Sequence, residues 1–70
     1  MARIIKVGDS VTCRIGNELY TSTIEGIEIC KDGDKYGRSV TKCDLSKHKN
    51  GVVDLKEHWA YFYQITKINS

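Results

Sequence analysis

The sequence predicts an all-β fold, a small barrel of five strands in which residues 1–70 form a single domain. Three observations lead to this expectation. Apolar and polar residues alternate in short stretches, β-branched residues are frequent within them, and glycine-containing turns separate them. The chain has 70 residues, and a domain of this size buries only about 60% of the surface that its unfolded chain exposes. We therefore expect shallow surface hollows and no deep active site.

The first expected strand covers residues 10–15 and follows a short break at residues 7–9. Val11, Cys13 and Ile15 alternate there with polar residues. A period of two residues is typical of a strand that buries one face and exposes the other. We therefore expect these three side chains in the core.

A tight turn at residues 16–17 leads into a long second strand at residues 19–30. The turn consists of glycine and asparagine, which both tolerate positive φ. Ile24 and Ile27 lie on opposite parities of this strand, so simple alternation cannot bury both. Gly26 lies between them, and glycine inside a strand often marks a β-bulge. The sequence therefore predicts a bulge or bend at this point.

A polar stretch at residues 31–35 is interpreted as an exposed loop. A third strand is expected from about residue 37 to residue 47. Thr41, Cys43 and Leu45 would share one of its faces.

Asn50 and Gly51 form the sharpest hairpin signal in the chain, because a type I′ turn needs positive φ at both central positions. Such a turn would pair Lys49 with Val52 and lead into a fourth strand at residues 52–55. His48 would then pair with Val53.

Two interpretations compete for the C-terminal stretch. Asp54 and Glu57 have the spacing of a capping box. A helix starting there would align four apolar or β-branched residues, namely Leu55, Trp59, Phe62 and Thr66. However, residues 61–66 are rich in aromatic and β-branched side chains, which lose rotamer freedom in helices. We predict one helical turn at residues 56–59 and a fifth strand at residues 61–68.

Five strands with a helical turn before the last one describe a small SH3-like barrel. Residues 7–11 (Val-Gly-Asp-Ser-Val) and 19–27 (Leu-Tyr-Thr-Ser-Thr-Ile-Glu-Gly-Ile) resemble the opening of Tudor and KOW-type barrels, and the resemblance covers residues 7–30. For Tudor domains it implies an aromatic cage for methylated side chains, to which Tyr20 would contribute. The Asp-Tyr-Gly-Asn-like turn that usually completes such a cage is missing here. For KOW-type barrels it implies RNA or ribonucleoprotein partners.

The charge balance does not indicate a dedicated nucleic-acid binder. Lysine and arginine number 11 against 9 aspartate and glutamate residues, and the pI is about 8.5. The second half of the chain is the more basic, with six basic and three acidic residues over residues 36–70. Four basic residues are candidates for phosphate contacts, namely Arg38, Lys42, Lys47 and Lys49. Solubilising roles or protection of a strand edge are the simpler explanation for them.

The three cysteines and two histidines lack the spacing of a metal site. Structural zinc sites usually take two ligands from one tight turn, whereas Cys13, Cys30 and Cys43 are widely separated. An odd number of cysteines without a disulfide pattern favours a reducing compartment, and no stretch resembles a signal peptide. We therefore expect a cytoplasmic protein that has no cofactor or metal and is not an enzyme.

The aromatic residues near the C-terminus are the strongest indication of a function. Alternation places Tyr61 and Tyr63 on one face of the expected strand and Phe62 on the other. Exposed Tyr and Trp favour recognition because they offer a large contact area with few rotatable bonds. We therefore expect a module that binds a protein partner through an edge strand and the aromatics Trp59, Tyr61, Tyr63 and Tyr20. Nucleic-acid binding through the basic residues is the alternative.

The cysteine spacing gives a first testable prediction. Because the thiols are expected to pack rather than to bind metal, protein purified without added metal should contain no stoichiometric zinc. A chelator should leave the unfolding transition unchanged. Elemental analysis and far-UV circular dichroism are the measurements, and one zinc ion per chain would overturn the packing interpretation.

Overall fold

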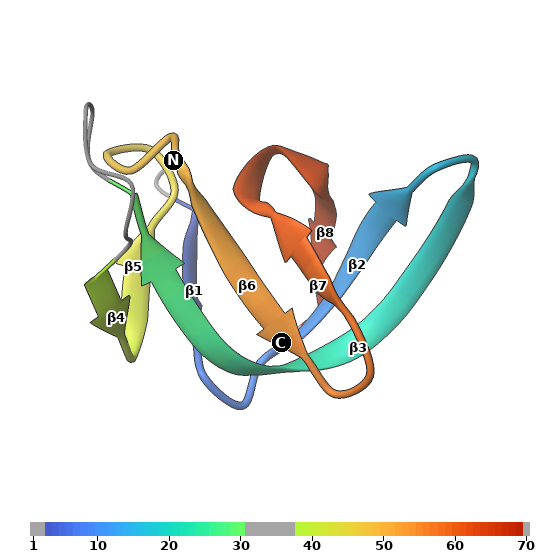
Figure 1. Cartoon of the computed structure of the whole chain (residues 1–70), viewed down its shortest axis with the longest axis horizontal. Helices are drawn as coiled ribbons and strands as arrows, with labels where there is room; N and C mark the ends of the chain where they lie inside the picture. Colours follow the sequence, from blue (N-terminus) through green and yellow to red (C-terminus); the bar gives the residue numbers. More distant parts are fainter. Residues whose placement is uncertain (1–2, 31–37, 70) are drawn as a thin grey trace.

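The structure is a computed structural model that describes residues 3–30 and 38–69, residues 38 and 39 by their backbone alone. It contains strands and a single 3₁₀ turn (Figure 1). The elements follow in the order β1 (Ile4–Lys6), β2 (Ser10–Ile15), β3 (Glu18–Ile29), β4 (Arg38–Val40), β5 (Lys42–Asp44), β6 (Gly51–Leu55), β7 (Trp59–Tyr61), η1 (Phe62–Gln64) and β8 (Ile65–Ile68). The expected all-β class is confirmed. Among these elements there is no helix long and apolar enough to cross a membrane.

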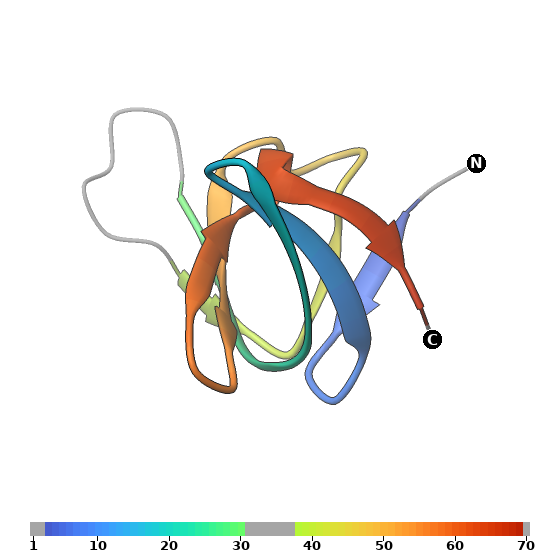
Figure 2. The same ribbon diagram turned by 90° about the vertical axis from the view of Figure 1, so that its right-hand side faces the viewer.

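The strands form two sheets, and all the pairings are antiparallel. The larger sheet has the order β7-β6-β3-β2-β8, and β4 pairs with β3 beside this path. The smaller sheet contains β1 and β5. Viewed from the side, the strands curve around a central region (Figure 2), where the buried apolar side chains pack together. In the described part of the chain β7 and β8 do not pair, so the larger sheet is not closed by backbone hydrogen bonds.

Strand β3 joins the two halves of the larger sheet. Its first half pairs with β2 and its second half with β6 and β4. The register against β6 shifts between Ile24 and Gly26, which leaves Glu25 as the extra residue of a bulge. The shift allows Ile24 and Ile27 both to be buried. The predicted bulge is therefore confirmed.

Within residues 3–30 and 38–69, the core contains eleven buried apolar residues, which come from seven of the eight strands and from η1. They are Ile5, Val11, Cys13, Ile24, Ile27, Cys43, Val53, Leu55, Ala60, Phe62 and Ile65. Val11 and Cys13 are buried as the alternation predicted, whereas Ile15 is only partly buried against the core.

The turn between β1 and β2 is fixed onto β3 from both sides. Gly8 has a φ of 100° and donates its N–H to the Ile24 carbonyl at 2.8 Å. The Ile24 N–H donates back to the Asp9 carbonyl at 2.8 Å. The buried Asp9 carboxylate accepts the Lys6 N–H at 3.1 Å. These bonds hold the smaller sheet against the middle of β3.

The third expected strand is divided into two. β4 ends at Val40 and β5 begins at Lys42, with a bend at the exposed Thr41. β4 pairs with β3, whereas β5 pairs with β1. The prediction of one continuous strand was wrong because the chain changes its pairing partner at this point. The loop expected at residues 31–35 lies outside the described residues.

The hairpin predicted at Asn50 and Gly51 was also wrong. Positive φ is confined, among the described residues, to Gly8 and Gly16. Gly51 is instead the first residue of β6, where it pairs with Ile29. A β-carbon at Gly51 would overlap the Phe62 ring and the Glu28 carbonyl oxygen. Glycine is therefore needed here for close packing rather than for its backbone conformation.

The C-terminal stretch was predicted only in part. A single helical turn precedes the last strand, but it is η1 at Phe62–Gln64 and not at residues 56–59. The strand predicted at residues 61–68 begins only at Ile65, because residue 61 ends β7 and η1 follows it. Residues 56 and 57 form the tip of a hairpin between β6 and β7, closed by the Leu55 N–H and the His58 carbonyl at 2.6 Å. The capping-box interpretation fails because Asp54 belongs to β6.

The packing at Gly51 gives a second prediction. Gly51→Ala should lower the free energy of unfolding by about 1–3 kcal/mol, the usual cost of overpacking. In a double-mutant cycle, Phe62→Leu should reduce this penalty, because a smaller side chain leaves room for the added methyl group. Urea unfolding followed by far-UV circular dichroism measures both. Independent, additive effects of the two substitutions would show that the ring does not restrict residue 51.

Candidate functional site

Three aromatic rings form a contiguous exposed cluster, which we call the aromatic ladder (Trp59, Tyr61 and Tyr63). The exposed fractions of these side chains are 53%, 41% and 79%, respectively. The Trp59 and Tyr61 rings meet edge to face with their centroids 5.0 Å apart. The Tyr61 and Tyr63 rings stack with centroids 5.4 Å apart and an angle of 10° between their planes. Both geometries are favourable for aromatic pairs, so the ladder is preorganised.

The ladder follows from the alternation along β7 and into η1. Ala60 and Phe62 point into the core, and the residues on either side of them point outwards. The predicted division of Tyr61 and Tyr63 from Phe62 is therefore confirmed. Ala60 is completely buried, so the small side chain lets β7 lie close to the core while the large rings remain outside.

The strand register places carboxylates beside the ladder on the same sheet face. Trp59 pairs with Asp54, and Asp54 pairs with Gly26. In the next row Tyr61 pairs with Val52, and Val52 pairs with Glu28. Directly paired residues of antiparallel strands point to the same side of the sheet.

Gly26 makes room for the Asp54 carboxylate. A β-carbon at Gly26 would lie only 2.9 Å from Asp54 Oδ2. The carboxylate therefore lies over the backbone of β3, close to the bulge at Glu25.

A hollow of about 300 Å³ opens beside the Tyr61–Tyr63 end of the ladder. Lys49, Asn50, Gly51 and Cys30 line its other sides. Lys49 is the one cationic side chain that lines this hollow within the described part of the chain. The surroundings of the ladder are thus acidic near Trp59 and basic near Tyr63.

The free edge of β7 is partly occupied by Gln64. Since Leu55 and His58 form a hydrogen-bonded pair, Trp59 and Tyr61 present their backbone groups away from β6. The Tyr61 N–H donates to Gln64 Oε1 at 2.9 Å, and Gln64 Nε2 donates to the Arg14 carbonyl at 3.2 Å. One side chain therefore connects the end of β7 to the end of β2 across the open side of the sheet.

Tyr20 does not join the aromatic ladder. Its ring lies 5.4 Å from the His58 ring, at an angle of 49°. Its hydroxyl donates to Glu18 Oε2 at 2.7 Å, and this bond together with the negative charge of Glu18 raises the pKa of Tyr20 above its usual value. A separate hollow of about 250 Å³ lies here, lined in part by Lys56 and Glu57. The structure thus separates Tyr20 from the other predicted partner-binding residues.

The predicted basic residues do not form one patch. Lys42 lies on β5 directly opposite Lys6 of β1. Lys47 and Lys49 follow β5 in an exposed turn. Arg38 begins β4, and its side chain lies outside the described residues.

The turn that carries Lys47 is organised by Asp44. The Asp44 carbonyl accepts the N–H groups of Lys47 and His48, both at 3.0 Å. The Asp44 carboxylate accepts the Ser46 hydroxyl at 2.6 Å and the Ser46 N–H at 2.9 Å. These two bonds, with smaller contributions from the Lys47 and His48 charges, lower the pKa of Asp44 below its usual value.

A third hollow, of about 350 Å³, is lined by Tyr63 but not by Tyr61. Arg3, His48 and Lys49 line it together with Phe62 and Ile65. Arg3 was not among the residues predicted from the sequence. Its backbone carbonyl accepts the Leu45 N–H at 2.8 Å, which brings the start of the chain to this hollow.

The three cysteines are free, and they differ in burial. Cys13 and Cys43 are buried, and burial raises the pKa of both thiols; for Cys43 the neighbouring Asp44 charge adds to the effect. Cys30 is partly exposed. Residues 3–30 and 38–69 contain no group of three His, Cys, Asp or Glu side chains close enough to hold a metal ion.

Comparison with known proteins gives no relative. Neither a protein-family model, nor a curated protein, nor a solved structure matches this chain.

The bridge made by Gln64 gives a third prediction. Gln64→Ala removes a donor and an acceptor and should lower the free energy of unfolding by about 1–2 kcal/mol, as expected for two hydrogen bonds. Gln64→Glu keeps the acceptor for the Tyr61 N–H and loses the donor, so it should fall between wild type and Gln64→Ala. Urea unfolding measures the order. Equal stability of all three proteins would show that the bridge contributes nothing.

Proposed function

We propose that the chain is an SH3-like barrel that serves as a non-catalytic module for binding a protein partner. Two features support the barrel. The sheet order β7-β6-β3-β2-β8 and the 3₁₀ turn before the last strand fit that architecture. The side chain of Gln64 spans the open side between β7 and β2.

The aromatic ladder is the observation that carries the proposed binding function. Trp59, Tyr61 and Tyr63 are exposed and already hold one another in stacked and edge-to-face contacts. Little rotamer entropy is lost when such rings are covered, and Trp and Tyr are the residues most enriched at binding hot spots. Three adjoining exposed rings form an apolar patch of the kind that marks an interaction site, so a partner is the simplest reason for them.

A binding role also fits the shape of the surface better than catalysis does. The described hollows hold about 250–380 Å³. A reaction centre needs groups that exclude water and transfer protons at close range. The three free thiols are compatible with a reducing, cytoplasmic setting.

The aromatic side chains would make most of the contacts with the partner, and the edge of β7 would make fewer. Addition of a partner strand requires free N–H and C=O groups along an edge. β7 has only three residues, and the Tyr61 N–H is already bonded to Gln64. We therefore propose that the edge of β7 contributes at most its groups at Trp59.

A second candidate function rests on the hollow beside Tyr63. Arg3, His48 and Lys49 line it, and Tyr63 offers an exposed ring at its rim. Cations that contact phosphates, next to a ring on which a base can stack, are the elements of single-stranded nucleic-acid binding. Lys42 and Lys6 lie elsewhere, so this site would hold only a short stretch.

The fourth prediction separates these functions by affinity capture from a lysate of the native cells. Wild type, Tyr61→Ala and Tyr63→Ala serve as baits, with and without nuclease. Leu19→Ala is the matched control, because Leu19 is 65% exposed and lies on the β2–β3 hairpin, away from the ladder. We expect nuclease-resistant capture of a protein by wild type and Leu19→Ala. Each tyrosine variant should bind it about 30-fold more weakly, which corresponds to a hot-spot loss of ~2 kcal/mol.

Circular dichroism confirms the folding of each bait before the comparison. Capture that is abolished by nuclease and by Lys47→Glu/Lys49→Glu, but not by the tyrosine substitutions, would favour the nucleic-acid function. Equal capture by all baits would overturn the role of the ladder.

A further inference from the structure

We propose that the aromatic ladder binds a cationic segment of its partner, with arginine or lysine side chains lying over Tyr61 and Trp59 and paired with Asp54 and Glu28. This inference rests on the proposed function and adds the chemistry of the partner. It follows from the register of three strands, which brings two carboxylates to the sheet face that the rings cover.

The rings and carboxylates occupy two neighbouring cross-strand rows. One row contains Trp59, Asp54 and Gly26, and the other contains Tyr61, Val52 and Glu28. Gly26 has no side chain, and the Asp54 carboxylate occupies the space over it. Each carboxylate therefore lies within one or two strand spacings of a ring, about 5–10 Å. An arginine side chain that stacks on a ring can reach a carboxylate at this range.

Both carboxylates are available for a partner. Asp54 and Glu28 are exposed. Within the described part of the chain, neither side chain forms an ion pair or accepts a hydrogen bond. An unpaired carboxylate beside an aromatic face offers a cation two attractions at once, one from the ring quadrupole and one from the charge.

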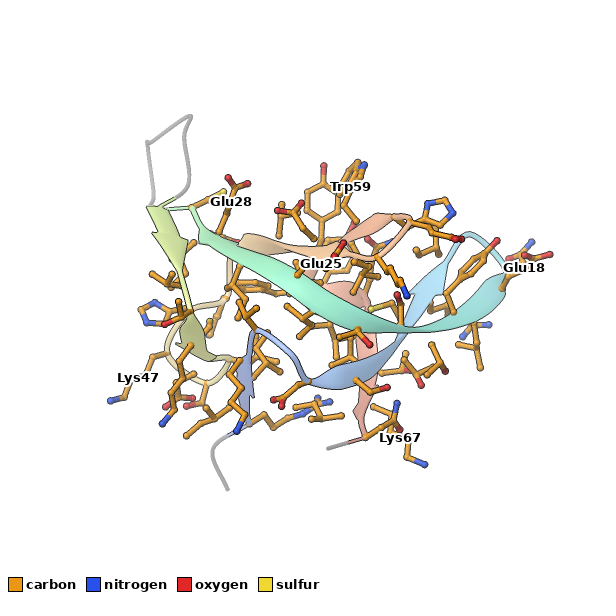
Figure 3. All side chains as sticks on the ribbon, turned by 90° about the horizontal axis from the view of Figure 1, so that it is seen from below. Glu18, Glu25, Glu28, Lys47, Trp59 and Lys67 are labelled. Atoms are coloured by element: carbon orange, nitrogen blue, oxygen red, sulfur yellow. The ribbon has the colours of Figure 1, made fainter. Side chains whose placement is uncertain are left out.

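Among the described residues, two of the lysines lie away from the ladder. Glu28 and Trp59 project from one side of the molecule, whereas Lys47 and Lys67 project from the opposite side (Figure 3). Lys49 borders the Tyr63 end of the ladder. A cationic segment would therefore lie over the Trp59–Tyr61 end and avoid Lys49.

The size of the ladder sets the length of the segment. The successive ring centroids are 5.0 and 5.4 Å apart. An extended chain advances about 3.3–3.6 Å per residue, so roughly three to five residues cover the ladder. Alternate side chains of such a segment would point towards the rings.

The same charges disfavour the other occupants. A nucleic-acid backbone would place phosphates next to two carboxylates, which repel them. A second copy could meet this face only with its basic side, in a head-to-tail contact that closes into a ring or grows into an open assembly and therefore depends on protein concentration.

The test is a titration of ¹⁵N-labelled protein with the blocked peptide Ser-Arg-Ser-Arg-Ser, followed by amide chemical shifts. The matched control peptide carries citrulline, which has the shape of arginine without its charge. We expect the shifts to map to β6, β7 and the second half of β3, with the arginine peptide binding at least about tenfold more tightly than the citrulline peptide. Raising the salt concentration should reduce this ratio.

Three protein variants complete the test. Asp54→Asn and Glu28→Gln keep the side-chain shape and should each weaken the arginine peptide about threefold to tenfold without changing the citrulline peptide. Lys49→Gln is the matched control, and it should leave the affinity unchanged or raise it slightly.

The outcomes separate this inference from the proposed function. If Tyr61→Ala weakens both peptides equally while Asp54→Asn and Glu28→Gln have no effect, the binding role of the ladder stands and the cationic partner is wrong. The inference is equally overturned if neither peptide shifts residues of β6 and β7 at millimolar concentration. Tighter binding of a ten-nucleotide oligouridylate to the same residues would also overturn it, as would a dilution series in which the same resonances move without any peptide.

Discussion

Ile24 and Ile27 both face the core, although they are three positions apart on one strand, because Glu25 is left unpaired between them. Without this bulge, one of the two isoleucines would face solvent and β3 could not serve both halves of the sheet. The same shift sets the register of β6, and β6 in turn sets that of β7. The positions of Asp54, Glu28 and the aromatic rings therefore all depend on one extra residue in β3.

Local sequence patterns predicted those parts of the fold that depend on neighbouring residues alone. Period-two alternation found β2, and the broken parity at Gly26 found the bulge. Gly51 shows where local patterns fail. Glycine next to asparagine indicates a turn, but here the glycine is required because the ring of Phe62, distant in the sequence, packs against it. The break at Thr41 is also a long-range effect. The chain changes its pairing partner there from β3 to β1, and the pattern of the surrounding residues does not indicate this change.

The candidate site was also predictable only where it depends on local alternation. Alternation alone placed Tyr61 and Tyr63 opposite Phe62, whatever the exact position of the helical turn. The carboxylates were missed because Asp54 had the spacing of a helix cap, and Glu28 reaches the ladder only through two strand pairings. Gln64 and Arg3 were missed for a similar reason, since their partners lie far away in the sequence. Residues that act through register or long-range contacts need the tertiary structure to be recognised.

The two buried thiols are built-in probes of local and global unfolding. Cys13 lies in the larger sheet and Cys43 in the smaller one, both with almost no exposed surface. A thiol reacts as its thiolate, so each can be alkylated only after its surroundings have opened. The relative alkylation rates of these two cysteines therefore distinguish separation of β1 and β5 from unfolding of the whole chain. Cys30, at the hollow beside Tyr61, is more accessible and serves as an internal reference in the same reaction.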